Sequence, residues 1–346
     1  MDCFIDVPED IAKYVKSKNA EEAIAELKME NARKRKLTNM SKEAQGKLFN
    51  MMDQHPKGPE VGLRSILTQD AYAIANNSNI EYRQKALQGI AESYIPELKQ
   101  KLSTTKLGFD RDKQLGRDFI KAIFGDTEGN PIASRLAKEW QGASDFIRER
   151  YNKFGGNIGK LDYGYIPQSH DRVAVQKANK DEWVAFIQPL LKNSDDVDLN
   201  YIYDTIATGG LNKVKEGSVG KGKSIANKNA DPRILHFKNA DDWITYQEKF
   251  GNADPLASID NHIRSLTTDM SMMEILGPNP NHMFETLKTK ASKDMIGKNG
   301  KEWSSYTDSL YAVVSGKVDN DLKGIGLLGP TAQTLRAVNT ATMLGS

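Results

Sequence analysis

The sequence is short of cysteine, of long apolar runs and of net charge. Its single cysteine, Cys3, has no second thiol to pair with, so no disulfide can form within the chain. A reducing compartment, or one where disulfides are not needed, is the simplest expectation. We interpret this isolated thiol as an incidental residue and not as a nucleophile.

No stretch of the sequence reaches the roughly 18 apolar residues that a membrane-spanning helix needs. The opening residues 1–10 lack the basic and apolar segments of a signal peptide. The sequence therefore predicts a soluble chain, or a soluble part of a longer one. An apolar helical pattern at 331–344 stops without a cap or a polar tail, which favours a fragment that continues beyond its last residue.

Positive and negative charges nearly balance, with 48 Lys and Arg against 46 Asp and Glu. Nucleic-acid-binding domains usually carry a large basic excess, so this balance argues against a dedicated binder. Any contact with DNA would have to come from a local patch, and the most basic one joins Arg33, Lys34, Arg35 and Lys36. The favoured interpretation of this cluster is a solvated helix end, where the helix dipole stabilises cations, and a weak DNA contact is the alternative.

Helical periodicity is what the sequence has in quantity. Between 131 and 154, apolar residues recur at steps of three and four, which places them on one face of a helix. A second strong pattern starts with Asp254 as the N-cap and Pro255 in the first turn, and it ends at Gly277. Further helices are expected at 20–36, 41–54, 80–102 with a kink at Pro96, 110–124, 241–250, 282–296, 301–315 and 331–344.

Alternation of polar and apolar residues is scarce, and only 164–168 and 233–237 could form short extended pieces. The predicted class is therefore mainly α, as one or more irregular multi-helix bundles with two long loops and at most minor β structure. The loops are expected at 155–171 and 208–233. The expected division of the chain is an N-terminal helical region 1–105, a helical region 106–207, a flexible Gly- and Lys-rich loop 208–238, and a C-terminal helical region 239–346.

The second loop contains GSVGKGKS, which matches the phosphate-loop pattern through Gly217, Gly222, Lys223 and Ser224. A working phosphate loop leaves a buried strand and opens a helix, so that backbone N–H groups converge on the phosphates. The preceding TGGLNKVKE lacks a strand's apolar run, and IANKNADPRILHF leaves little room for a helix. We interpret the match as a product of composition, and we predict no nucleotide or other cofactor.

Two further motifs suggest chemistry. Glu92 stands in a Glu-Ser pair similar to that of lytic transglycosylases, but it lies on an ordinary helical pattern, and a solvent-facing residue is the favoured interpretation.

His170 and Asp171 resemble the paired metal ligands of HD phosphohydrolases, for which His55 and Asp269 would have to complete the site. The favoured interpretation is structural, with Asp171 capping the next segment and His170 bonding the backbone. We predict no catalytic and no metal-binding residue.

The order of several segments resembles part of large phage and prophage proteins described as internal virion or ejection-type proteins. The segments include IFGDTEGNPIASRLAKEWQGASDFIRERYNKFGGNIGKLDYGYIPQSHD, DEWVAFIQPLL, YIYDTIATGG, ILHFKNADDWITYQEKFG and IDNHIRSLTTDMSMMEILGPNP. The resemblance runs from about residue 123 to 280 and is weaker on both sides. Its most specific piece is the turn formed by Pro167, Gln168, His170 and Asp171, followed by Trp183 and the stop at 277–280.

This resemblance implies a structural, non-catalytic module of a virion-associated protein that acts in genome delivery. It also implies a chain made in the bacterial cytoplasm and packed in the capsid interior, with the host envelope as a destination after ejection. Other virion proteins, and further copies of the chain, are the implied partners. Two alternatives stay open: an enzymatic module of the same machinery, cleaving peptidoglycan or hydrolysing nucleotides, and a prophage interaction or effector protein outside the virion.

Overall fold

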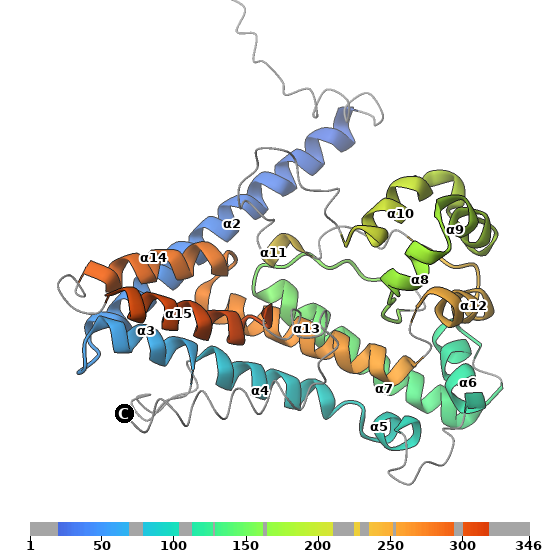
Figure 1. Cartoon of the computed structure of the whole chain (residues 1–346), viewed down its shortest axis with the longest axis horizontal. Coiled ribbons are helices and arrows are strands. Elements are labelled where there is room, and N and C mark those ends of the chain that lie inside the picture. The colour runs from blue at the N-terminus through green and yellow to red at the C-terminus, as the bar shows by residue number, and fades with distance from the viewer. Residues whose placement is uncertain are drawn as a thin grey trace, which may run out of the picture.

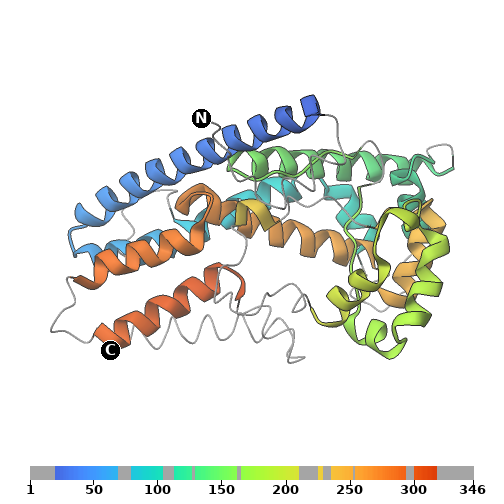
Figure 2. The same ribbon diagram turned by 90° about the horizontal axis from the view of Figure 1, so that it is seen from above.

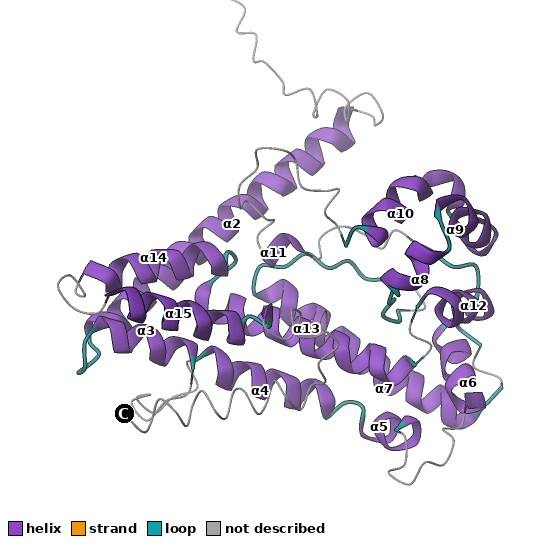
Figure 3. Ribbon diagram, in the orientation of Figure 1, coloured by secondary structure: helices purple, strands orange, loops and turns teal. Residues whose placement is uncertain are grey.

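The structure, a computed structural model, describes residues 20–68, 79–103, 113–126, 129–161, 165–209, 225–228, 235–251, 254–293 and 300–317. Within these residues the regular structure is helical, which confirms the mainly α prediction (Figures 1 and 3). The α-helices are α2 (Ala20–Asp53), α3 (Pro59–Leu67), α4 (Ile80–Glu92), α5 (Pro96–Leu102), α6 (Lys113–Ile123), α7 (Pro131–Lys153), α8 (Arg172–Lys177), α9 (Lys180–Ile187), α10 (Leu199–Ala207), α11 (Ile225–Lys228), α12 (Ala240–Phe250), α13 (Pro255–Leu276), α14 (Pro280–Ser292) and α15 (Gly300–Val314). Cys3 and the helix expected at 331–344 lie outside the described residues.

Helix α13 is the centre of the molecule (Figure 1). Asp254 caps it by accepting hydrogen bonds from the N–H groups of Leu256 and Ala257, and it ends at Gly277, whose φ of 81° suits a residue without a side chain. Both ends were predicted. The polar residues Thr267, Asp269 and Ser271 are buried together with the apolar stripe, because other helices cover α13 on several sides.

Two apolar clusters share α13. The first joins α4–α10 and α12 to most of its length, and the second joins α2, α3, α14 and α15 to its last turns. Figures 1 and 2 both show the two groups at opposite ends of the molecule, with α8, α9, α10 and α12 at one end and α14 and α15 at the other. Each cluster combines segments that lie far apart in the sequence. The predicted division into consecutive regions remains a prediction.

Helix α2 corrects one expectation. Two helices were predicted, at 20–36 and 41–54, but a single helix of 34 residues runs through the expected break. The hydroxyl of Thr38 donates to the carbonyl of Lys34, and that of Ser41 to the carbonyl of Leu37, at 2.9 Å in both cases. These side chains bond one turn back within the helix instead of ending it, and residues 37–40, where the break was expected, include neither glycine nor proline.

Two more expectations differ from the structure, one at α3 and one at the pair α4 and α5. The segment 80–102 was expected to be one helix kinked at Pro96, but α4 ends at Glu92 and α5 begins at Pro96. Ile95 has φ −124° and ψ 39°, outside the helical region, because the proline ring disfavours a helical residue before it. Helix α3 was not predicted at all, although Pro59 occupies a favourable position in its first turn.

Extended structure is limited, in the described residues, to one isolated antiparallel bridge between Leu191 and Phe237. It is flanked by hydrogen bonds from Lys192 N to His236 O at 2.7 Å and from Lys238 N to Leu190 O at 3.0 Å. The bridge uses the expected extended piece at 233–237, whereas residues 165–168 of the other expected piece form no strand. None of the described helices combines the length and the apolar character that crossing a bilayer requires.

Candidate functional site

The turn at 165–171, singled out by the sequence, lies against helix α12 through paired hydrogen bonds. The hydroxyl of Ser169 donates to Oε1 of Gln247 at 2.8 Å, and Nε2 of Gln247 donates back to the carbonyl of Ser169 at 3.2 Å. The backbone N–H of Asp171 donates to the carbonyl of Phe250 at 2.8 Å. The turn is therefore fixed to the last turns of α12, about 80 residues away along the chain.

His170 contributes to the same contact. Its Nδ1 lies 2.8 Å from the hydroxyl oxygen of Tyr246. Burial raises the pKa of Tyr246 well above its usual range, so the phenol keeps its proton and can donate it to the imidazole. The sequence predicted a backbone partner for His170, and this contact to a buried side chain of α12 was missed.

A glycine makes the close contact between turn and helix possible. A Cβ atom on Gly251 would lie 2.9 Å from the carbonyl oxygen of Ser169 and closer still to the side chain of Gln247. We therefore expect Gly251→Ala to push the turn away from α12 and to lower the free energy of unfolding by about 1–2 kcal/mol. Urea denaturation measures this loss. Gly89→Ala is the matched control, because a Cβ there meets nothing within 4 Å, and an equal loss in both variants would contradict the prediction.

The start of the turn is held from the other side by α7 and α13. The indole N–H of Trp140 donates to the carbonyl of Tyr165 at 2.6 Å, and the Tyr165 hydroxyl lies 2.8 Å from Nε2 of His262. Nε2 of Gln168 donates to the carbonyl of Leu235 at 3.0 Å. The turn thus joins α7, α13 and α12, and His262 of α13 takes part in that junction.

His170 and Asp171 resemble a metal-binding pair, but in the structure their side chains contact protein groups. Oδ1 of Asp171 accepts the N–H groups of Val173 and Ala174, at 2.9 and 3.0 Å, which confirms the predicted cap of the following segment, α8. The described residues, which include His55 and Asp269, contain no group of three or more His, Cys, Asp or Glu that could hold a metal ion. Asp171 acts in local structure, and His170 acts in the contact between the turn and α12.

Glu92 lies in an ion-pair network. Its carboxylate is 3.2 Å from the ammonium of Lys99, which also lies 3.5 Å from Oδ1 of Asp260. Burial raises the pKa of Asp260, while the nearby Lys99 acts in the opposite direction. The network joins α4, α5 and α13. Glu92 is thus used in a contact between helices, and its side chain, 33% exposed, is half-buried where the sequence suggested a solvent-facing residue.

The phosphate-loop match at Gly217, Gly222, Lys223 and Ser224 lies outside the described residues. Directly after it, residues 225–228 form the short helix α11, where the sequence was expected to leave little room for one. Its first carbonyl, of Ile225, accepts the hydroxyl of Tyr151 at 2.7 Å. The N–H of Ala226 donates to the carbonyl of Pro278 at 3.3 Å. Helix α11 is thus fixed to the end of α7 and to the 277–280 stop.

The basic cluster of α2 divides into inward and outward residues. Arg33 turns inward and donates through Nη2 to the carbonyls of Gly155 and Ala226, at 3.2 Å each. Lys34, Arg35 and Lys36 are exposed. The guanidinium of Arg33 is used to hold α2 against the end of α7 and α11. The favoured interpretation of the cluster as a helix end is wrong, because α2 continues to Asp53, and the DNA contact stays a prediction.

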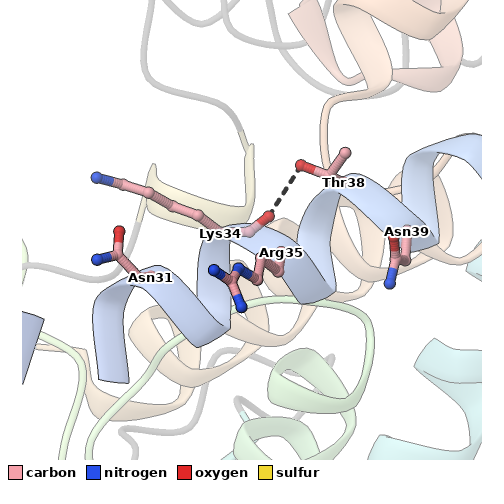
Figure 4. A pocket seen from close by; sticks show the side chains of 5 residues that line it. All are labelled: Asn31, Lys34, Arg35, Thr38 and Asn39. Atoms are coloured by element: carbon pink, nitrogen blue, oxygen red, sulfur yellow. Dashed lines mark hydrogen bonds between the residues drawn. The ribbon is translucent and has the colours of Figure 1, made fainter. Parts of the chain in front are cut away.

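An open hollow lies on the outward side of α2 (Figure 4). It is lined by Asn31, Lys34, Arg35, Thr38 and Asn39, all from this one helix. Their side chains offer two cations and two amides as donors suited to anionic oxygens, whereas the Thr38 hydroxyl already donates to the carbonyl of Lys34. Within the described residues this surface is the strongest candidate for binding a partner.

Comparisons with known proteins do not identify any of these sites. No family model, curated protein or solved structure matches this chain. The resemblance to phage virion proteins remains a prediction from the sequence. The candidate sites therefore have to be judged by their own contacts, which are structural at Glu92 and at the turn, and open to a partner at α2.

Proposed function

We propose that the chain is a structural helical module of a phage virion-associated protein that acts in genome delivery and does not catalyse a reaction. The observation that supports this most directly is the use of the suggestive residues in contacts between elements. His170 and Asp171 join the turn to α12 and α8, and Glu92 shares Lys99 with Asp260. The sequence resemblance supplies the virion context.

Part of the helix packing is local, which suits a chain that has to refold after passing a narrow channel, although other pairs such as α4 and α13 join distant segments. The consecutive pairs α2 and α3, α6 and α7, and α13 and α14 are in contact. Helices that pack on their neighbours in sequence form contacts with little loop closure, which favours rapid folding. The single cysteine removes internal crosslinks that would hinder threading.

Mass spectrometry of purified particles tests the proposal. Virions from the producing host are treated with nuclease and purified by density gradient, and peptides of this chain are quantified against the major capsid protein. We expect a constant ratio across gradient fractions, and we expect the chain to leave the particles together with the DNA when ejection is triggered. A chain that is abundant in the cells and absent from the particles would instead support the prophage effector alternative.

The enzymatic alternative is tested with the purified chain. Turbidity clearing of peptidoglycan by the wild type, abolished in Glu92→Gln and kept in the control Glu81→Gln on the same helix, would establish catalysis and overturn the proposal. Nucleotide affinity that is lost in Lys223→Ala would do the same for a nucleotide-hydrolysing module. We expect no activity or affinity in either assay.

A further inference from the structure

The outward side of α2 carries a straight row of cations. Lys28, Arg35 and Lys42 are all exposed and follow each other at intervals of seven residues. Because two helical turns take about 7.2 residues and each residue rises about 1.5 Å, the three side chains lie almost in line, roughly 10 Å apart. The hollow with Lys34 lies beside this row. We call the surface formed by Lys28, Lys34, Arg35 and Lys42 the basic ridge.

Acidic residues of the same helix do not interrupt the row. Glu26 and Glu30 fall on the opposite half of the helix by their positions, and Glu43 falls to one side. Glu30 lies 2.8 Å from Lys34, at the edge of the basic ridge, so that one cation is partly neutralised. The row Lys28, Arg35 and Lys42 keeps a single sign of charge over four turns.

The opposite side of α2 holds the helix in place. Arg33 donates to two backbone carbonyls there, and Leu48 is buried in the second apolar cluster, with Ala44 packed against it. Leu37 packs against the first cluster. The apolar residues of α2 that contact these clusters are therefore used within the molecule, whereas Ile24 and Met29, nearer its start, are exposed.

We propose that the basic ridge binds the phosphate backbone of double-stranded DNA without regard to sequence. Duplex DNA carries one negative charge per about 1.7 Å of its axis, so a straight row of cations meets phosphates along its whole length. The amides of Asn31 and Asn39 add the neutral donors that commonly contact phosphate and sugar oxygens. This inference goes beyond the proposed function, and its test does not depend on finding the chain in virions.

The same geometry argues against a lipid surface as the partner. An interfacial helix inserts an apolar side between lipid headgroups and keeps its cations at their level. In α2 the apolar residues Leu37, Ala44 and Leu48 are packed against the rest of the molecule. Ile24 and Met29 are exposed in its first turns, but they are five residues apart and fall on different sides of the helix, so they do not form a continuous apolar side for insertion. A rigid array of phosphates with a regular spacing fits this surface better.

Fluorescence anisotropy with two unrelated 25-base-pair duplexes tests the proposal on the whole chain. Each phosphate contact changes the logarithm of affinity by about −0.9 per logarithm of salt concentration, so three to four cations predict a slope of about −3 to −4. Both duplexes should bind equally. The variant Lys28→Gln, Arg35→Gln, Lys42→Gln should lose affinity about tenfold or more at low salt and flatten the slope by about 3.

A matched variant controls for total charge. Lys138→Gln, Lys153→Gln, Lys177→Gln removes three exposed cations from α7 and α8 and should leave affinity and slope nearly unchanged. Glutamine is a good helix former, and circular dichroism confirms that both variants are folded. Equal losses in the two variants, or a wild type whose DNA affinity does not depend on salt, overturn the proposal. So does tighter binding to vesicles with 30% anionic lipid than to DNA, if the basic-ridge variant abolishes it.

Discussion

Replacing Trp140 by alanine is expected to lower the free energy of unfolding by about 3–5 kcal/mol, the range for removing a buried aromatic side chain. Trp140 is 1% exposed and lies in the first apolar cluster. Its ring stacks on Tyr165 with centroids 6.2 Å apart and meets the edge of His262 at the same distance. The loss therefore combines a cavity in α7 with the release of the 165–171 turn. Urea denaturation followed by circular dichroism measures it.

Two further variants separate these effects. Trp140→Phe keeps most of the ring and removes the N–H that donates to the Tyr165 carbonyl, so we expect an intermediate loss of about 1–2 kcal/mol. Ile132→Ala, on an exposed residue of the same helix, should cost less than about 1 kcal/mol. Hydrogen exchange at 165–171 should rise in Trp140→Ala. Equal stability losses in Trp140→Ala and Ile132→Ala would show that the indole does not hold this junction.

The sequence predicted best the elements whose ends carry local chemical signals. Asp254 caps α13 as expected, because an N-cap side chain bonds backbone groups two or three residues away. The apolar period of α7 also agrees with its buried residues, apart from Ile132, which is 36% exposed. Local signals and local bonds thus account for the part of the fold that could be predicted.

Elements that depend on distant partners were predicted less well. Helix α3 was missed because it is short, and it lies so close to α2 that a Cβ on Gly62 would be 2.9 Å from the Cα of Met52. The break expected within α2 is absent, since Arg33 and Leu37 hold the helix against segments more than 100 residues away. Neither contact has a counterpart in the sequence near these residues.

In the candidate sites, too, local contacts were predicted and contacts with distant segments were not. The cap formed by Asp171 was predicted, since it acts on the next residues, whereas the contacts of Ser169 and His170 with α12 were not. The basic cluster was recognised from four adjacent letters, but adjacent residues of a helix point in different directions. The signal for the basic ridge is the interval of seven between Lys28, Arg35 and Lys42, which a search for consecutive cations overlooks.

Breaking the bidentate ion pair between Arg83 and Glu274, called the fork below, is expected to cause the second large loss of stability. Nε and Nη2 of Arg83 donate to the two carboxylate oxygens of Glu274 at 3.0 and 2.9 Å, and the side chains are only 19% and 21% exposed. Beside it, Nε2 of Gln84 donates to the hydroxyl of Thr268 at 2.7 Å. The pair joins α4 to the central helix α13. Glu274→Gln should lower the free energy of unfolding by about 2–3 kcal/mol, because it leaves a half-buried guanidinium without its counter-charge.

An exposed pair on the same helix provides the comparison. Lys85 and Glu81 lie 2.8 Å apart with side chains 66% and 35% exposed, so Glu81→Gln should cost less than about 1 kcal/mol, and that small loss should shrink in 1 M salt. A double-mutant cycle with Arg83→Gln and Glu274→Gln measures the coupling directly. A coupling energy near zero would mean that apolar packing alone holds α4 on α13. A coupling of about 2 kcal/mol that persists in high salt would show that this fork fixes the register of the two helices, since a bidentate pair tolerates little displacement.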